Sequence, residues 1–180
     1  MMFLPKKPAV FLDRDGVLTE EKSYITSVEN LAIFPYAAEC IRQIHKKGYY
    51  AIVITNQSGV ARGFFSEEVL CQMNQYLIQS TGVDAVYYCP HHEDGIIEKY
   101  RKKCDCRKPG MGLIEMACRE YEIDLEKSYM IGDRASDILM GKAAGIKTVL
   151  LESGYGTARL ESAVVPDYVL DDLSDVINIL

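Results

Sequence analysis

The chain has 180 residues, of which 48% are hydrophobic and 26% charged, values that suit an ordinary globular domain and exclude a disordered or fibrous chain. Its 20 Lys and Arg against 26 Asp and Glu give a formal charge of −6, the wrong sign for binding nucleic acid through its phosphates. We therefore expect one domain over residues 1–180, with no nucleic-acid partner.

No apolar run approaches the roughly 20 residues that a membrane helix needs. Residues 1–7 also lack the layout of a signal peptide. We therefore expect a cytoplasmic protein that has no membrane partner and acts as a monomer.

Short apolar runs alternate with stretches of helical period, which is the pattern of βαβ units. Strands are predicted at residues 9–12, 50–54, 85–88, 128–131, 147–151 and 168–170. Helices are predicted at residues 36–47, 66–81, 111–121, 135–144 and 173–180. The sequence thus predicts a Rossmann-like α/β fold, with a parallel sheet and helices on both of its faces.

Two segments lack this regularity, residues 13–35 after the first strand and residues 89–110 after the third. Both follow the carboxyl end of a predicted strand, and ligands bind at that edge of an open α/β sheet. We expect the two segments to form the walls of a site. Neither is long enough for a second domain, so no large cap domain is expected.

Polar residues follow four of the predicted strands. Asp13 and Asp15 follow the first strand, and in extended chain they face the same side. The other three strand ends carry Thr55 and Asn56, then Lys108, then Asp133 and Asp137. Taken singly, the acidic residues are equally typical of a turn or a helix cap, and a Lys-Pro pair alone does not indicate a functional site. Their combination is improbable by accident and indicates one shared site.

The four motifs are D-R-D-G at 13–16, T-N at 55–56, K-P at 108–109 and G-D-R-A-S-D at 132–137. They resemble the motifs of the haloacid dehalogenase-like phosphohydrolases, and the resemblance covers nearly the whole chain. It implies that Asp13 is the nucleophile that attacks phosphorus. It implies that Asp15 is the general acid and base, held protonated beside another carboxylate. Thr55, Asn56 and Lys108 would bind the remaining phosphoryl oxygens.

The same resemblance implies a Mg²⁺ site at the strand ends. Asp13, the main-chain carbonyl of Asp15 and Asp133 would be ligands, and Asp137 would act through a water. The ion would offset the repulsion between Asp13 and the phosphoryl group.

A second metal site is predicted in the segment after the third strand. Cys89 and His91 form one pair of soft ligands, and Cys104 and Cys106 form another. Three thiolates and one imidazole make a closed tetrahedral zinc site of the structural type. His91 is preferred over His92 because residues two apart in extended chain share a face; free surface cysteines are the alternative.

Cys106 lies two residues before Lys108. Anchoring Cys106 to zinc would therefore fix the direction of the Lys108 side chain. We hypothesise that zinc supports Lys108 and that its loss lowers phosphatase activity.

The two ligand pairs resemble those of two zinc-containing branches of the superfamily, the heptose bisphosphate phosphatases and the histidinol-phosphate phosphatases. The long span between the pairs favours the heptose branch, which implies a small phosphorylated sugar as substrate. Thr19 and Glu21 replace the Asn and Asp usual in that branch, whereas Tyr24 is kept. A zinc-stabilised binding module without turnover is the other alternative.

Three arginines are candidates for binding a second phosphate or the substrate hydroxyls, with surface charge as the alternative for each: Arg62, Arg107 and Arg134. Cys40, Cys71 and Cys118 lie in predicted helices among apolar neighbours, so we expect all three to be core residues.

Overall fold

The computed structural model describes residues 6–180, so residues 1–5, on which part of the signal-peptide expectation rests, lie outside it. Six parallel strands form one sheet in the order β3-β2-β1-β4-β5-β6. The strands are β1 (Ala9–Leu12), β2 (Tyr50–Asn56), β3 (Ala85–Cys89), β4 (Tyr129–Gly132), β5 (Lys147–Leu151) and β6 (Tyr168–Leu170). The chain order runs outward from β1 in one direction and then from β4 in the other. The switch point lies between β1 and β4, where open α/β sheets bind ligands.

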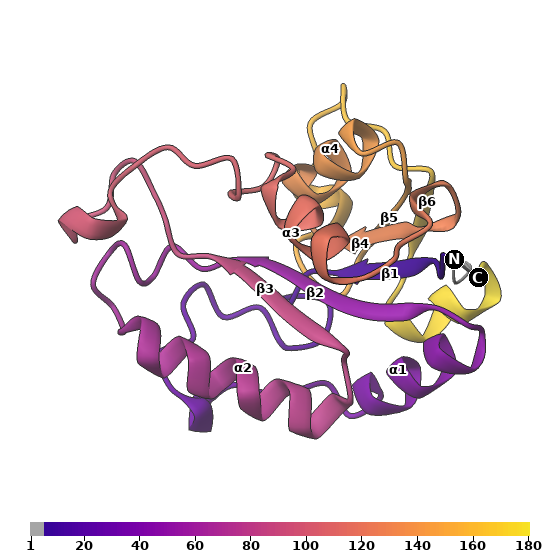
Figure 1. Ribbon diagram of the computed structural model, residues 1–180, viewed down its shortest axis with the longest axis horizontal. Helices are drawn as coiled ribbons and strands as arrows, with labels where there is room; N and C mark the ends of the chain where they lie inside the picture. Colours follow the sequence, from indigo (N-terminus) through magenta and orange to yellow (C-terminus); the bar gives the residue numbers. More distant parts are fainter. Residues whose placement is uncertain (1–5) are drawn as a thin grey trace, which may run out of the picture.

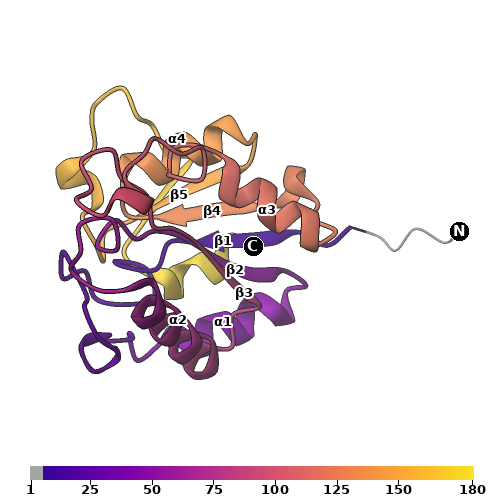
Figure 2. The same cartoon turned by 60° about the vertical axis from the view of Figure 1, so that its left-hand side comes forward.

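Helices cover both faces of the sheet, as predicted (Figure 1). They are α1 (Ala37–Lys46), α2 (Glu67–Thr81), α3 (Gly112–Glu120) and α4 (Ala135–Ala143). The helices α1 and α2 lie on one face and α3 and α4 on the other (Figures 1 and 2). The start of α2 is capped by the Ser66 hydroxyl, which accepts from the Val69 N–H at 3.2 Å, and α2 ends at Gly82 with φ of 80°.

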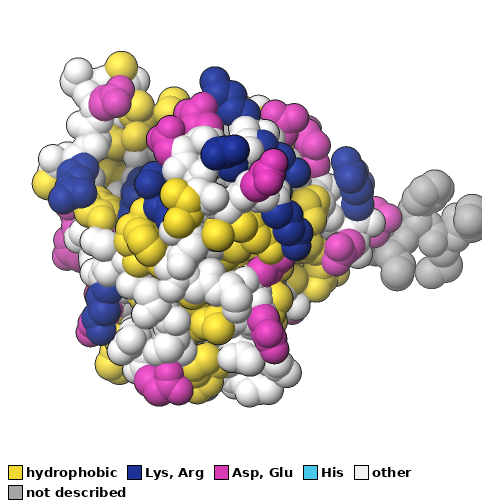
Figure 3. All heavy atoms as spheres, turned by 90° about the vertical axis from the view of Figure 1, so that its left-hand side faces the viewer, with side chains coloured by type: hydrophobic (Ala, Val, Ile, Leu, Met, Phe, Trp, Pro, Cys, Tyr) yellow, Lys and Arg dark blue, Asp and Glu magenta, His cyan; other side chains and the backbone are white. Residues whose placement is uncertain are grey.

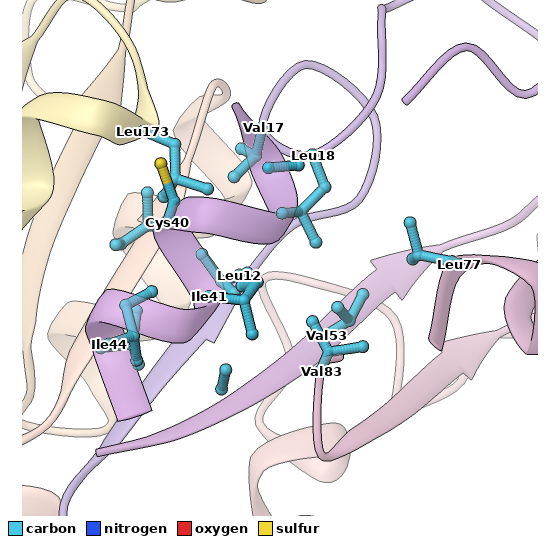
Figure 4. Packing of buried hydrophobic residues seen from close by; sticks show 14 of the residues in the cluster. Leu12, Val17, Leu18, Cys40, Ile41, Ile44, Val53, Leu77, Val83 and Leu173 are labelled. Atoms are coloured by element: carbon cyan, nitrogen blue, oxygen red, sulfur yellow. The ribbon is translucent and has the colours of Figure 1, made fainter. Parts of the chain in front are cut away.

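The core has two layers because side chains alternate along each strand. Val10 and Leu12 of β1 pack on the side of α1 and α2, whereas Phe11 packs on the side of α3. Figure 4 shows the first layer, where Leu12 lies beside Ile41 of α1. All of these side chains are fully or almost fully buried.

The predicted α/β fold is confirmed, with two differences in detail. The last predicted helix is a 3-10 helix at Leu173–Asn178. Cys40 is buried as expected and Cys118 is half-buried, but Cys71 is exposed, and its Sγ lies 3.6 Å from the Tyr88 hydroxyl of β3. Within residues 6–180, the segments after β1 and β3 contain only short 3-10 helices at Val28–Asn30 and Glu98–Tyr100 and isolated bridges. No helix in this described part is long and apolar enough to span a membrane.

Candidate active site and metal centres

A cavity of about 200 Å³ opens where the carboxyl ends of the strands meet. Both segments expected to form walls contribute to it, the first through Tyr24 and Glu21 and the second through Arg107 and Lys108. The loops gather at this end of the sheet in Figure 2, and the same end faces the viewer in Figure 3. There, hydrophobic side chains lie between groups of both charges.

Three carboxylates meet at the floor of the cavity. Asp13, Asp133 and Asp137 each offer an oxygen, and these oxygens lie within 4.8 Å of one another. Lys108 Nζ lies 2.9 Å from Asp13 Oδ1 and 2.6 Å from Asp137 Oδ1. All four residues are buried. Three acids beside one ammonium leave an excess of two negative charges when ionised, which suits a divalent cation with oxygen ligands.

Asp133 is held by one carboxylate oxygen, while the other makes no hydrogen bond among the described residues and lies 3.9 Å from Arg134 Nε. Its Oδ2 accepts from the Tyr155 N–H at 2.9 Å, whereas its buried Oδ1 has no hydrogen-bond partner among the described residues. Burial, together with the charges of Asp13 and Asp137, raises the pKa of Asp133 to about 7. An orphaned oxygen among like charges fits a metal ligand.

Two glycines let the chain approach Asp133 closely. Gly16 has φ of +83°, and a Cβ there would lie 2.4 Å from Asp133 Oδ2. A Cβ on Gly154 would lie 2.1 Å from the same oxygen. The turn after β1 and the loop after β5 therefore both require glycine, because a side chain at either position would overlap the Asp133 carboxylate.

The Asp15 carboxylate lies in a network that the sequence reasoning did not find. Arg14, whose residue is fully buried, donates to both carboxylate oxygens of Asp15 at 3.0 and 3.1 Å. Gln57 and Thr19 also donate to this carboxylate, each at 3.0 Å. Burial acts to raise the pKa of Asp15, but Arg14 and these hydrogen bonds outweigh it and lower the pKa. The surroundings of Asp15 thus favour its carboxylate form, which differs from the expectation of a protonated Asp15.

Asn56 and Thr55 lie at the end of β2 and line the cavity, as predicted, but their side chains have different hydrogen-bond partners. Asn56 Oδ1 accepts from the Lys108 N–H at 3.0 Å, and Asn56 Nδ2 donates to the Lys108 carbonyl at 3.2 Å. The Asn56 side chain thus holds the main chain of Lys108, and Asn56 also lines the cavity. The Thr55 hydroxyl accepts from Gln57 Nε2 at 2.9 Å, which leaves its proton for a ligand.

The three candidate arginines occupy different places. Arg107 and Arg134 line the cavity. Arg134 pairs with Glu21 at 2.9 Å, and its guanidinium lies 4.2 Å from the centre of the Tyr155 ring. Arg62 is not among the lining residues; its Nη2 lies 3.3 Å from His92 Nε2. Its side chain thus turns towards the segment after β3, and the expectation that Arg62 contacts the substrate stays a prediction.

The four predicted soft ligands come together beside the cavity. Cys89, His91, Cys104 and Cys106 offer atoms within 4.8 Å of one another. Cys106 Sγ lies 2.8 Å from both other sulfurs, and His91 Nδ1 lies 3.6 Å from Cys106 Sγ. The hydrogen bond from Cys106 lowers the pKa of Cys89 to about 6. Three cysteine sulfurs and one imidazole nitrogen at these distances form a donor set that suits zinc.

Sequence reasoning missed Arg14, Gln57 and Tyr155. The first two were present in the motifs D-R-D-G and T-N-Q-S-G, but nothing in a pattern shows that an arginine turns inward. Tyr155 acts through its main-chain N–H, which leaves no trace in the residue type.

Three comparisons with known proteins all find phosphatases or hydrolases of one kind. A family model described as HAD-hydrolase-like matches residues 105–176. The D-glycero-beta-D-manno-heptose-1,7-bisphosphate 7-phosphatase of Haemophilus ducreyi is 38% identical over 177 residues, which cover 95% of this chain and 97% of that protein. The enzyme of the same name from Rhodopseudomonas palustris is 44% identical over 147 residues, which cover 79% and 82%. The crystal structure of D,D-heptose 1,7-bisphosphate phosphatase from B. bronchiseptica, complexed with magnesium and phosphate, superposes with a TM-score of 0.81 at 29% identity and covers 96% of this chain and 97% of that one.

Proposed function

The chain belongs to the haloacid dehalogenase-like phosphatases, in the family of the heptose-1,7-bisphosphate 7-phosphatases, and we propose that it removes the C7 phosphate of D-glycero-D-manno-heptose 1,7-bisphosphate. The observation that carries the proposal is the buried group of Asp13, Asp133, Asp137 and Lys108 under the cavity. We further propose that the reaction serves ADP-heptose synthesis for the lipopolysaccharide core. The enzyme would act in the cytoplasm as a monomer, with one domain over residues 1–180.

In the first step, an Asp13 carboxylate oxygen attacks phosphorus and the bond from phosphorus to the C7 oxygen breaks. The leaving oxygen takes a proton from Asp15, and the phosphoryl group stays on Asp13 as an aspartyl phosphate. In the second step, water gives a proton to Asp15 and attacks phosphorus. The bond to Asp13 then breaks, which releases phosphate and restores the carboxylate.

As a carboxylate, Asp15 can accept the proton of the second step but has none to donate in the first. It must collect a proton before it can protonate the leaving oxygen. A phosphate monoester has a second pKa of about 6, so the substrate in its monoanionic form brings such a proton. Arg14 and Gln57 keep the Asp15 carboxylate in one orientation for both transfers.

Mg²⁺ is the cofactor that haloacid dehalogenase-like phosphatases use, and a solved relative contains magnesium with phosphate. Asp13, Asp133 and the main-chain carbonyl of Asp15 would hold it here, with Asp137 acting through a water. When bound, the ion offsets negative charge at the phosphoryl group and polarises that group. Lys108 and the Thr55 hydroxyl would contact the other phosphoryl oxygens.

Zinc is proposed at Cys89, His91, Cys104 and Cys106, as a structural ion that supports Lys108. Because Cys106 and Lys108 are separated by one residue, a fixed Cys106 limits where the Lys108 ammonium can lie. The proposed role is positioning and not chemistry, because four protein ligands leave no open position.

Arg107 and Arg134 are proposed to contact the far end of the substrate, either its second phosphate or its hydroxyls. Arg107 is half-buried, and its Nη1 donates to the His91 carbonyl at 3.4 Å, a weak partner for a guanidinium. Arg134 would have to share its charge between the substrate and Glu21. Arg62 remains a further candidate, although it does not line the cavity.

The test is phosphate release from heptose 1,7-bisphosphate and from histidinol phosphate, side by side, with Mg²⁺ and zinc-loaded protein. We expect a preference of about 100-fold for the heptose, which is about 2.7 kcal/mol of transition-state discrimination. A preference for histidinol phosphate would assign the chain to the other branch. Asp13→Asn should abolish release from either substrate; if neither the native chain nor this variant releases phosphate, the chain is a binding module.

A further inference from the structure

Glu67, at the start of α2, is the centre of a polar cluster that lies outside the proposed active site. Tyr100 donates to Glu67 Oε2 at 2.6 Å, and Tyr88 of β3 donates to Glu67 Oε1 at 3.1 Å. Lys99 Nζ lies 3.5 Å from the same carboxylate. The Tyr100 hydrogen bond is the main cause of a lowered Glu67 pKa, so the acceptor is a carboxylate and both hydrogen bonds are charge-assisted. We call Glu67, Tyr88, Lys99 and Tyr100 the Glu67 cluster.

Tyr100 connects this cluster to the zinc-binding loop, the segment after β3 that carries His91, Cys104 and Cys106. It lies in the span between the two ligand pairs, and its carbonyl accepts from the His92 N–H at 3.1 Å. Its ring lies 6.2 Å, centre to centre, from the His91 ring. One residue therefore holds the chain next to His91 through its backbone and reaches α2 through its hydroxyl.

The four soft ligands are held in different ways. Cys89 ends β3 and is fully buried in the sheet. The Cys104–Cys106 turn is closed by hydrogen bonds to the start of α3, including that from the Gly112 N–H to the Asp105 carbonyl at 2.9 Å. His91 belongs to no helix or strand.

The span that follows His91 is held to the rest of the chain by several contacts. The Ile97 N–H donates to the Ala61 carbonyl at 3.0 Å, and His92 lies 3.3 Å from Arg62. The bond from Tyr100 to Glu67 is shorter than either, at 2.6 Å, and it ends on a charged acceptor.

We propose that the Glu67 cluster positions the zinc-binding loop, with Tyr100 as the positioning residue that places His91 against the three sulfurs before the metal arrives. This inference rests on the zinc part of the proposed function and not on the substrate. A ligand that is already in place loses less conformational freedom on binding. The bond from Tyr100 to Glu67 therefore raises the affinity for zinc without touching the ion.

The chain supplies its own matched control. Tyr100→Phe and Tyr88→Phe each remove one hydroxyl that donates to Glu67, but only Tyr100 belongs to the span between the ligand pairs. A role in folding alone would make the two changes equivalent for zinc binding. A role in positioning His91 would separate them.

The experiment measures zinc affinity of the full chain by competition with a chromophoric chelator, and the visible absorption of the Co²⁺-loaded protein. We expect Tyr100→Phe to weaken zinc binding about 10-fold and Tyr88→Phe to change it less than about 2-fold, in line with the loss of an outer-shell partner. The Co²⁺ bands should change for Tyr100→Phe alone. Glu67→Gln keeps an acceptor but removes its charge, so it should give an intermediate loss, and it replaces Tyr100→Phe if that variant does not fold.

Equal zinc affinities for the native chain and Tyr100→Phe, or equal losses for the two tyrosine variants, would overturn the proposal. If the native chain binds no zinc, the metal site and this inference both fail. Phosphate release with Mg²⁺ alone then still tests the proposed substrate, so the two failures can be told apart.

Discussion

Gly154→Ala is the sharpest test of how the loop after β5 sets the magnesium site. A Cβ at Gly154 would lie 2.1 Å from Asp133 Oδ2 and 2.6 Å from Asp133 Cγ. The carboxylate or the loop must therefore move by about 1 Å to restore van der Waals contact, because a packed interior has no spare room. Such a shift would lengthen the hydrogen bond from the Tyr155 N–H to Asp133, which is 2.9 Å in the native chain.

The expected effect follows from the value of that bond. A hydrogen bond to a charged group contributes about 1.5–3 kcal/mol, and each 1.4 kcal/mol corresponds to about a factor of ten in affinity. The Mg²⁺ concentration for half-maximal phosphate release should therefore rise about 10- to 100-fold in Gly154→Ala. The rate at saturating Mg²⁺ should fall less than the rate at low Mg²⁺.

The assay is phosphate release titrated with Mg²⁺, and Gly82→Ala is the control. Gly82 has φ of +80° with nothing within 4 Å of its Cβ position. Alanine there costs about 1 kcal/mol of stability but is remote from the site. If Gly154→Ala has the Mg²⁺ requirement of the native chain, the loop does not set the position of Asp133 and the reasoning is wrong.

Three further outcomes are expected. Removing zinc, or making Cys106→Ser, should lower phosphate release several-fold with Mg²⁺ in excess, as measured in parallel with zinc content; unchanged activity in folded, zinc-free protein would contradict the support role. Arg14→Met should destabilise the chain near pH 7 by about 1.5–3 kcal/mol in denaturant unfolding, because it removes the charged donor of the half-buried Asp15 carboxylate; since the folded pKa of Asp15 lies below 3.8, this contribution is present above that pH and is lost as the pH falls through the folded value, so the difference should shrink in acid. Cys40→Ser should cost about 1–3 kcal/mol, whereas Cys71→Ser should stay within about 0.5 kcal/mol; equal thermal shifts would contradict the difference in burial.

The strands were predictable because both faces of a parallel sheet are buried, which makes each strand a continuous apolar run. The burial of all four residues of β1 illustrates this. The helices were predictable where a terminal residue marks the end, as Gly82 does for α2. The helix from Leu173 was less predictable, because so short a segment cannot stabilise an α-helix by propensity alone, and it packs against α1.

The active-site residues were predictable as a set because the carboxyl ends of parallel strands meet at one edge, so strand position alone brings Asp13 and Asp133 together. The use of each polar group was not predictable. Whether Asn56 contacts a phosphate or the Lys108 backbone depends on the distance between two loops that sequence spacing does not fix. The same holds for Arg14, whose neighbour Asp15 offers a partner only because both side chains turn inward.

Lys108 is held by several independent contacts, and these limit how far the loss of zinc can lower the activity. Its main chain is held by both polar groups of Asn56, and its ammonium lies between Asp13 and Asp137. The zinc-bound Cys106 would add a third constraint, on the chain two residues earlier. Because the first two constraints remain when zinc is removed, Lys108 would still populate the productive position for part of the time. A graded fall in activity, and not its abolition, is therefore the outcome that this geometry requires of Cys106→Ser.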